Sequence, residues 1–306
     1  FSSPSESKLL QAYQKDWKKY SKFKNGPFPR LEKMTDLMIG TEGQLGVITE
    51  AEFKVVDAFK SRFFFVQLPN WEKSFETHYE IYRSLCNNRD VLIALEFIDS
   101  NSIKIMGPDF SKFKVGRDFI FMEVNQEKID DFMEVLLNQL GFDLSKVFEI
   151  KEEEYKNIRL ELPRAVAEFI SANQLSKIGT DVQVSSEDFQ ILISKYRHFS
   201  DFGFEYCLFG HFGDAHLHFN FLPKEQNSEF CQKAMSNFYK DLAEITCSPF
   251  AEHGIGLLKK KHITQFYGSN QLALFKYLKK ILDPFNQFFP TGFMSIKDKS
   301  INLQSG

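Results

Sequence analysis

The sequence predicts an α+β domain with a largely antiparallel sheet and helices packed on one face. From residue 60 onward, strand-like and helix-like segments alternate: RFFFVQL, then a helical run with Trp71, Phe75 and Tyr82 on one face, then VLIALEFI. Helices between strands are also compatible with a parallel sheet. The segment YCLFGHFGDAHLHFNF, however, is typical of two strands joined by a Gly-containing hairpin, which favours antiparallel pairing.

Further elements follow from the spacing of apolar residues. FIFMEV predicts another strand, and helices are expected at about 151–172, 186–199, 225–246 and 269–282. The run Ser185-Ser186-Glu187-Asp188 offers a capping side chain to the second of these helices.

Length and composition exclude several classes of protein. A chain of 306 residues fits one large domain with a smaller appendage, and a net charge of -3 gives no attraction to nucleic acid. No apolar run reaches the roughly 18 to 20 residues that span a bilayer, and no signal segment opens the chain. The four cysteines form no CxxC pair, and the 35 Phe residues recur inside regular patterns. We therefore expect a soluble, cytoplasmic protein with reduced, buried thiols and an aromatic core, rather than an aromatic-substrate site.

The N-terminal region differs in composition from the rest of the chain. Residues 4–24 carry six lysines and few apolar anchors, which favours a solvated helical linker over a basic patch for membranes or nucleic acid. Pro27 and Pro29 interrupt any helix there. The next segment, DLMIGTEGQLGVITEAEFKVV, is β-prone but has Gly at every third position from 40 to 46, which indicates a close backbone approach.

Histidines are concentrated in the C-terminal half. Five of the seven lie between residues 198 and 253, and the densest cluster is HFGDAHLHFN. Strand alternation places His216, His218 and Asn220 on one face and the intervening apolar residues on the other. One face of this strand is therefore expected to be apolar and the other to be chemically active.

The hairpin also predicts half of a metal site. His211 ends the preceding strand, so the turn can return it to a position beside His218. Two imidazoles on adjacent strands suit a divalent metal, and a carboxylate from Glu252 or Asp214 would complete a set that leaves coordination positions open. A purely structural histidine pair is the alternative.

Two other groups could face the same cavity. In AEHGIG, Glu252 and His253 lie in a Gly-rich turn, which is free of the alternation of a strand and can direct both side chains to one side. A helix-entry turn with exposed polar residues is the alternative. Arg159 is a candidate ligand for a substrate carboxylate, with Lys177 as a second cation, unless both are ordinary surface residues.

These motifs resemble those of a known family. DLMIGTEGQLGVITEA is similar to the end of the FAD-binding (PCMH-type) domain of the vanillyl-alcohol oxidase type superfamily. GHFGDAHLHFN and AEHGIG resemble the C-terminal domain of its glycolate oxidase, D-lactate dehydrogenase and D-2-hydroxyglutarate dehydrogenase branch. The resemblance covers about residues 31–294, including the weaker motifs ALEFID, KIGTDVQV and DPFNQFFPTG. It implies three regions: a linker helix and remnant of the FAD-binding domain at 1–58, an FAD-linked oxidase C-terminal domain at 59–296, and a tail at 297–306.

The resemblance implies a role for each candidate residue. His253 is similar to the base that removes the hydroxyl proton of the substrate, and Asn220 to a residue near the reactive nitrogen of the flavin. Arg159, with Lys177 beside it, is similar to the site for the substrate carboxylate. The implied ligands of a divalent metal, such as Zn²⁺, are His211, His218 and Glu252. The implied FAD contacts, besides Asn220, are Gly40, Glu42, Gly43, Gly46, Val47 and Ile48.

The implied activity is FAD-dependent oxidation of a 2-hydroxy acid of the D-lactate, glycolate or D-2-hydroxyglutarate type. The metal would lower the pKa of the substrate hydroxyl, the base would take its proton, and hydride would pass to the flavin. The alternatives are a non-redox metal-binding or hydrolytic domain and a non-catalytic subunit. Asn220 and GTEGQLG argue against hydrolysis, which needs neither.

Several residues depart from the family pattern. Ala215 and His216 replace the usual Gly and Asn, Pro163 follows Arg159 by one helical turn, and Phe293 occupies the position of a common Lys. These departures leave the identity of the acid open.

The largest departure is the short stretch before GTEGQLG, where the family carries most of its FAD contacts. We expect this chain alone to bind FAD weakly and to be inactive, with the missing FAD-binding domain supplied by a longer chain or by a partner; the non-Met start favours the longer chain. The other expected partners are an electron acceptor of unknown identity, through which the protein could associate with a membrane, and a second copy in a homodimer.

Overall fold

The computed structural model describes residues 4–21, 23, 31–88, 90–107, 113, 116–139 and 143–295. The chain forms two compact units: unit 1 comprises the described parts of Phe1–Lys54 and Tyr239–Gly306, and unit 2 comprises Val55–Phe238. These units divide the chain differently from the regions expected from the sequence, because the segment after residue 238 clusters with the N-terminal segment. The two prolines predicted to interrupt the first helix, and the tail, lie outside the described residues.

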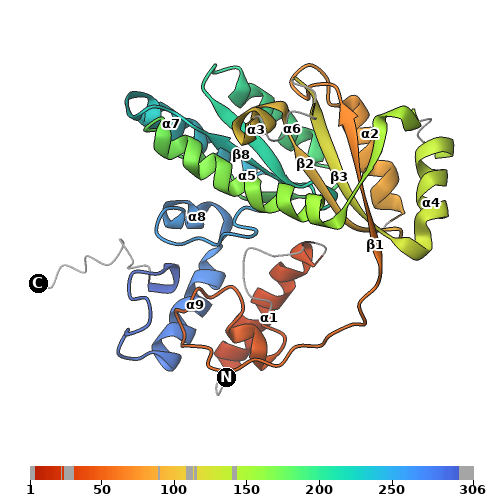
Figure 1. Cartoon of the computed structure of the whole chain (residues 1–306). Helices are drawn as coiled ribbons and strands as arrows, with labels where there is room; N and C mark the ends of the chain where they lie inside the picture. Colours follow the sequence, from red (N-terminus) through yellow and green to blue (C-terminus); the bar gives the residue numbers. More distant parts are fainter. Residues whose placement is uncertain are drawn as a thin grey trace, which may run out of the picture. The chain divides into compact units, whose positions relative to one another are not determined.

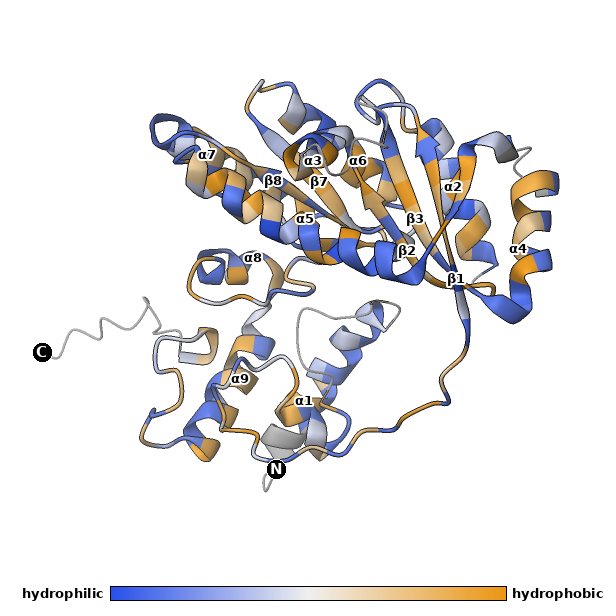
Figure 2. Cartoon of the chain, in the orientation of Figure 1, coloured by the Kyte–Doolittle hydropathy of each residue, from blue (hydrophilic) through white to orange (hydrophobic). Residues whose placement is uncertain are grey.

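Unit 2 is built on one antiparallel sheet, which confirms the predicted fold class. In this unit the strand order is β4-β1-β3-β2-β7-β8-β6, and β5 also pairs with β8. Figure 2 shows that the central strands are mainly apolar. The strands are β1 (Ser61–Leu68), β2 (Leu92–Ile98), β3 (Asp118–Asn125), β4 (Val147–Ile150), β5 (Ile178–Gly179), β6 (Val182–Val184), β7 (Tyr206–His211) and β8 (His216–Phe221).

The helices of unit 2 lie on both faces of the sheet and not on one face as expected (Figure 1). Phe63 and Ile98 pack with α3 and α5, whereas Phe64 and Phe97, which point to the other face, contact rings of α4 and α2. The helices are α2 (Glu76–Asn87), α3 (Ser100–Met106), α4 (Ile129–Glu134), α5 (Glu152–Ala172), α6 (Phe189–Ser200) and α7 (Glu225–Leu242), with short 3-10 turns at Gln126–Lys128, Leu144–Lys146 and Phe212–Asp214 and a π turn at Val135–Gln139. The expected aromatic core is confirmed by contacts between buried Phe rings: Phe65 with Phe121, Phe113 with Phe119, and Phe189 with Phe212.

The four helices predicted from apolar spacing agree with α5, α6, α7 and α9 to within a few residues. At the start of α6, the predicted run supplies a capping serine: Oγ of Ser185 accepts from the backbone N–H of Asp188 at 3.2 Å and donates to the Asp188 carboxylate at 3.0 Å. Asp188, which occupies the N-cap position, makes no capping bond of its own.

Unit 1 is mainly helical. Its first helix is not a solvated linker, because Tyr13, Trp17 and Tyr20 are buried and the ring of Tyr13 lies 5.9 Å from that of Phe275 in α9. Its elements are α1 (Pro4–Trp17), α8 (Ile263–Phe266), α9 (Ser269–Leu282), the short strand β9 (Cys247–Ser248), and 3-10 turns at Lys18–Tyr20, Met34–Leu37, Lys260–His262 and Phe293–Ser295.

The β-prone segment after residue 46 forms no strand among the described residues. Residues 46–60 are extended without regular structure, and their apolar side chains face solvent. Val47 and Ile48 are 72% and 61% exposed. The exposed large apolar residues of this segment are Val47, Ile48, Phe53, Val55, Val56 and Phe59.

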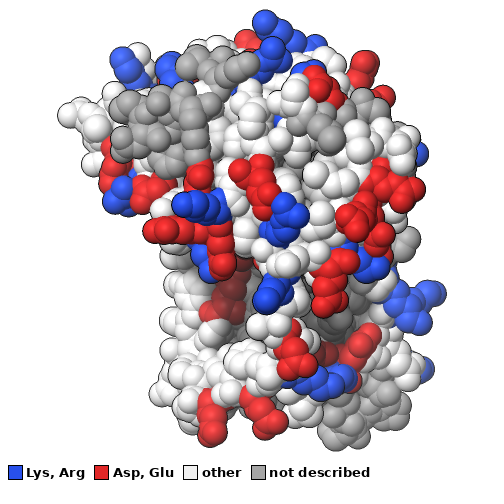
Figure 3. Space-filling model, turned by 45° about the vertical axis from the view of Figure 1, so that its right-hand side comes forward, with Lys and Arg blue, Asp and Glu red and all other residues white. Residues whose placement is uncertain are grey.

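Acidic and basic side chains are interspersed on the face shown in Figure 3, without a continuous basic patch. Among the described residues, no helix is long and apolar enough to cross a membrane.

Candidate active site

The hairpin of β7 and β8 places three histidines on one face of the sheet. His211 pairs with His216, and Phe209 pairs with His218, in antiparallel register. The ring centroids of His211 and His216 are 5.9 Å apart, and those of His216 and His218 are 4.6 Å apart. The predicted alternation on β8 is confirmed, although His211 lies opposite His216 and not opposite His218.

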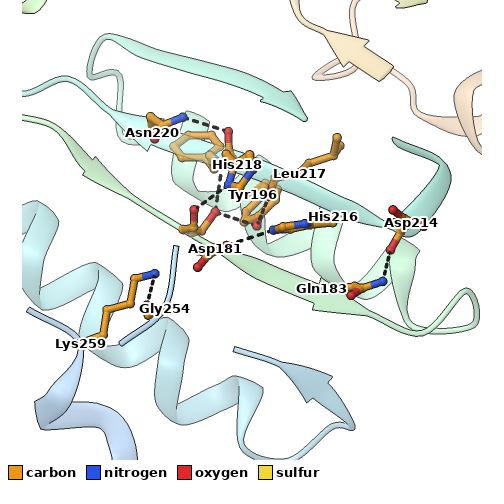
Figure 4. Close-up of polar contacts among 12 residues, drawn as sticks. Asp181, Gln183, Tyr196, Asp214, His216, Leu217, His218, Asn220, Gly254 and Lys259 are labelled. Carbon is orange, nitrogen blue, oxygen red and sulfur yellow. Dashed lines mark hydrogen bonds and ion pairs between the residues drawn. The ribbon is translucent and has the colours of Figure 1, made fainter. Parts of the chain in front are cut away.

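The partners of His211 and His218 fix which ring nitrogen carries the proton. The Nδ1 atom of His211 lies 3.1 Å from both carboxylate oxygens of Glu96, and Nδ1 of His218 lies 3.2 Å from the backbone carbonyl of Thr180 (Figure 4 shows His218). A carbonyl or carboxylate oxygen only accepts, so Nδ1 is the donor in both hydrogen bonds. Histidines that bind metals are commonly held in this way, by a carboxylate or a backbone carbonyl.

His216 has a different partner. Its Nε2 lies 3.1 Å from Oδ1 of Asp181, and both residues are buried (Figure 4). Burial lowers the pKa of His216, and the hydrogen bond to Asp181 opposes this effect. The additional imidazole found in the sequence is therefore part of a buried carboxylate-histidine pair.

Arg159 projects from α5 toward the same group. Its guanidinium lies 3.0 Å from Oε1 of Glu96, so Glu96 contacts both His211 and Arg159. The Arg159 side chain remains 45% exposed. The guanidinium is therefore paired with Glu96 on one side, and its exposed part is accessible to a second carboxylate.

Asn220 and Lys177 lie around Gly179. Asn220 is buried, and its amide donates to the carbonyl of His218 at 3.2 Å. A Cβ atom on Gly179 would collide with Oδ1 of Asn220 and would lie 3.8 Å from Cε of Lys177. Because Gly179 has no side chain, the amide of Asn220 can lie against the backbone of residue 179. Lys177 remains exposed.

Glu252 and His253 belong to unit 1, where both are exposed on the turn after β9. The backbone N–H groups of Ile255 and Gly256 in this turn donate to the carboxylate of Glu42. The rival carboxylate, Asp214, lies in the β7–β8 turn of unit 2, where its backbone carbonyl accepts from Gln183.

The metal set stays a prediction. Among the described residues of unit 2 taken alone, no three His, Cys, Asp or Glu side chains bring ligand atoms within 4.8 Å of one another.

The predicted FAD contacts lie in unit 1. Gly40 and Gly43 have the positive φ angles of 71° and 68° that glycine tolerates, and they shape turns on either side of Glu42. Gly46 lies next to Met38, and the side chains of the two following predicted contacts, Val47 and Ile48, are exposed.

Sequence reasoning gave no role to Glu96, Asp181 or the carboxylate of Glu42 as partners within the protein. The first two lie in ALEFID and KIGTDVQV, which were noted only as weak similarities. An acidic residue inside an otherwise apolar strand-like segment, as in ALEFID, was the available signal.

Comparison with known sequences gives a consistent result. Residues 60–291 match the family described as FAD linked oxidases, C-terminal domain. The chain is 24% identical to a mitochondrial D-lactate dehydrogenase (cytochrome) of Kluyveromyces lactis over 82% of this chain and 46% of that protein. It is 24% identical to a D-2-hydroxyglutarate dehydrogenase of Xanthomonas citri pv. viticola over 88% of this chain and 59% of that protein. It is 23% identical to the glycolate oxidase subunit GlcD of Bacillus subtilis over 87% and 57%.

The chain spans about half the length of these relatives. Among solved structures, it is similar to an alkyldihydroxyacetonephosphate synthase, with a TM-score of 0.51 and 15% identity, over 83% of this chain and 48% of that one. At this identity, the likeness concerns the fold alone.

Proposed function

The chain belongs to the FAD linked oxidases, as a C-terminal domain of that family, and on this basis we propose that it is the substrate-binding part of an FAD-dependent enzyme that oxidises a 2-hydroxy acid. The relatives support this substrate class, because lactate, 2-hydroxyglutarate and glycolate all carry a hydroxyl beside a carboxylate. The identity of the acid is left open by the departures at Ala215, His216 and Pro163.

The proposal depends most on the two imidazoles that are held through Nδ1 on one face. His211 and His218 both donate through Nδ1, so Nε2 is the ring atom that each would offer to a metal near the cationic Arg159. This donor set fits a divalent metal such as Zn²⁺, and we propose Glu252 as its third protein ligand. The proposal requires that the turn of Glu252 reach the histidine face in the working protein.

The residues also fit an FAD site supplied mainly by another domain. The exposed apolar side chains at Val47, Ile48 and along residues 53–59 would be covered by such a domain, which removes apolar surface from water. We propose that FAD contacts are made there and at Gly40, Gly43, Gly46 and Asn220. When bound, FAD supplies the acceptor for the hydride.

The residues of this chain then have separate tasks. The exposed part of Arg159, with Lys177, binds the carboxylate of the acid and fixes its orientation. The imidazole of His253 takes the hydroxyl proton while the Cα–H bond breaks and hydride leaves for the flavin. The products are a 2-oxo acid, a protonated base and a reduced cofactor, so the proton and the electron pair are both accounted for.

The test is expression of the complete reading frame and a titration of its flavin absorbance with D-lactate, glycolate and D-2-hydroxyglutarate under anaerobic conditions. Bleaching by at least one acid, but not by its 2-oxo product, is expected. A protein that binds metal and FAD but whose flavin is bleached by none of a broad panel of 2-hydroxy acids would contradict the proposal and favour a non-redox domain.

A further inference from the structure

We propose that Glu42 is a positioning residue for the turn of residues 252–256, rather than an FAD contact. The inference takes the roles of Glu252 and His253 from the proposed function, but its structural basis lies entirely within unit 1. It changes the role that family resemblance suggested for Glu42.

Both carboxylate oxygens of Glu42 are occupied by this turn. Oε1 accepts from the backbone N–H of Ile255, and Oε2 accepts from that of Gly256 at 2.9 Å. Hydrogen bonds from N–H groups to a carboxylate are about twice as strong as those between neutral groups. Glu42 therefore fixes the two successive peptide units that follow Gly254, one residue after His253.

Gly254 is required by the same contact. A Cβ atom at this position would lie 2.5 Å from Oε1 of Glu42, and its φ of +70° also favours glycine. The carbonyl of Gly254 accepts from Nζ of Lys259 at 3.1 Å, as Figure 4 shows. Two N–H groups of the turn thus donate to the carboxylate of Glu42, and one of its carbonyls accepts from the ammonium group of Lys259.

The segment that carries Glu42 is itself anchored. The side-chain oxygen of Gln44 accepts from the backbone N–H of Met294 at 2.8 Å, and its backbone carbonyl accepts from Nζ of the buried Lys279 at 2.7 Å. These contacts hold the GTEGQLG segment to the C-terminal part of unit 1. They give Glu42 a fixed base from which to hold the turn.

The backbone of the turn is therefore fixed, although two of its side chains are exposed to solvent. Glu252 and His253 are exposed, whereas Ile255 is buried and hydrogen bonded to Glu42. A base and a metal ligand act well only when their side chains are positioned to within about 0.5 Å, and hydrogen bonds from a supporting residue can provide this precision. Because Glu42 acts through the turn, its removal should affect turnover more than binding of the acid.

The direct test is amide hydrogen exchange at Ile255 and Gly256 in the complete protein. Glu42→Gln loses one acceptor and places a donor against an N–H group, so exchange at both amides is expected to rise about tenfold or more. The exposed Glu244→Gln, elsewhere in unit 1, should leave both rates unchanged. Protection of α9 amides reports whether the variant is folded.

A second pair of variants gives an independent check. Gly254→Ala and Gly256→Ala both place a side chain at positive φ, but only the first collides with Glu42, since nothing lies within 4 Å of a Cβ at 256. Gly254→Ala should therefore release Glu42 and raise exchange at Ile255 well above the level seen in Gly256→Ala. Equal exchange in the two variants would overturn the proposal.

The outcomes also separate this role from flavin binding and from the proposed function. For a positioning residue, Glu42→Gln keeps its FAD content and lowers kcat with little change in KM. Loss of FAD with unchanged exchange at Ile255 would overturn the proposal. If exchange rises as expected but no 2-hydroxy acid reduces the wild-type flavin, the positioning role stands and the proposed function fails.

Discussion

Replacing Glu96 by Ala is expected to weaken metal binding by about 10- to 100-fold. Glu96 accepts from Nδ1 of His211 with both oxygens at 3.1 Å, and it is almost fully buried. Loss of a hydrogen bond to a charged partner costs about 1.5–3 kcal/mol, and each 1.4 kcal/mol is a factor of ten in affinity. Partners of metal-binding histidines contribute about this amount when they are replaced.

The variant also loses the ion pair with Arg159, which joins a buried carboxylate to a guanidinium that is 45% exposed. Because both contacts are present without metal, the free energy of unfolding is measured as well, and metal affinity is compared under conditions in which the variant is folded. Glu96→Gln keeps one oxygen acceptor for His211 and should lose less affinity than Glu96→Ala.

The assay is calorimetric titration of the metal-free complete protein with Zn²⁺, alongside denaturant unfolding. Glu149→Ala is the matched control, because Glu149 also pairs with an arginine, Arg62, on this sheet but belongs to the edge strand β4. Wild-type metal affinity in Glu96→Ala, or an equal loss in Glu149→Ala, would refute this reasoning.

Three further predictions concern other histidines. His218→Ala should abolish stoichiometric metal binding in elemental analysis, since one of two Nε2 ligands is lost; retention of the metal would exclude His218 as a ligand. His253→Ala should lower the rate of flavin reduction by about 10²- to 10⁴-fold, whereas His216→Asn should leave it largely intact, and the reverse order would make His216 the base. Burial lowers the pKa of His262, which stacks on Tyr239, to about 4, so the unfolded state takes up a proton at this residue first and the free energy of unfolding should fall as the pH drops from 6.5 to 4. His262→Phe should flatten that part of the pH profile, and an unchanged slope would show that another group is responsible.

The order of strands and helices was predictable because local periodicity is strong in unit 2. The alternation of His216, Leu217 and His218 gave the correct faces of β8, since a strand has a period of two. The placement of helices on both faces was not predictable in the same way. It depends on the contact of Phe64 with Phe132 in α4 and on that of Phe97 with His78 in α2, which join parts of the chain that are distant in sequence.

Unit 1 shows where composition misled. Lysines dominate residues 4–24, yet Tyr13, Trp17 and Tyr20 recur at helical spacing and form a buried stripe. A count of charges does not detect this stripe, because it consists of only three residues. Three large aromatic rings nevertheless suffice to anchor a short helix. The β-prone character of residues 46–60 was real, but a strand needs a neighbour for its hydrogen bonds.

Candidate site residues could be proposed from their chemistry more readily than their partners could. Side-chain type and motif made His211, His218 and Arg159 candidates, whereas Glu96 joins two of them through a contact between β2, β7 and α5. Such a contact brings together residues separated by about half of the domain. Only the folded chain shows that one carboxylate serves both an imidazole and a guanidinium.

We propose that the complete protein transfers a hydride from the α carbon of a 2-hydroxy acid to FAD. The most direct test is anaerobic single turnover with an α-deuterated acid, with the 2-oxo acid and the reduced flavin both quantified. We expect one 2-oxo acid per reduced flavin and a slower reduction with the deuterated substrate. Reduced flavin without 2-oxo acid, or no reduction by any 2-hydroxy acid in a protein that retains FAD and metal, would contradict it.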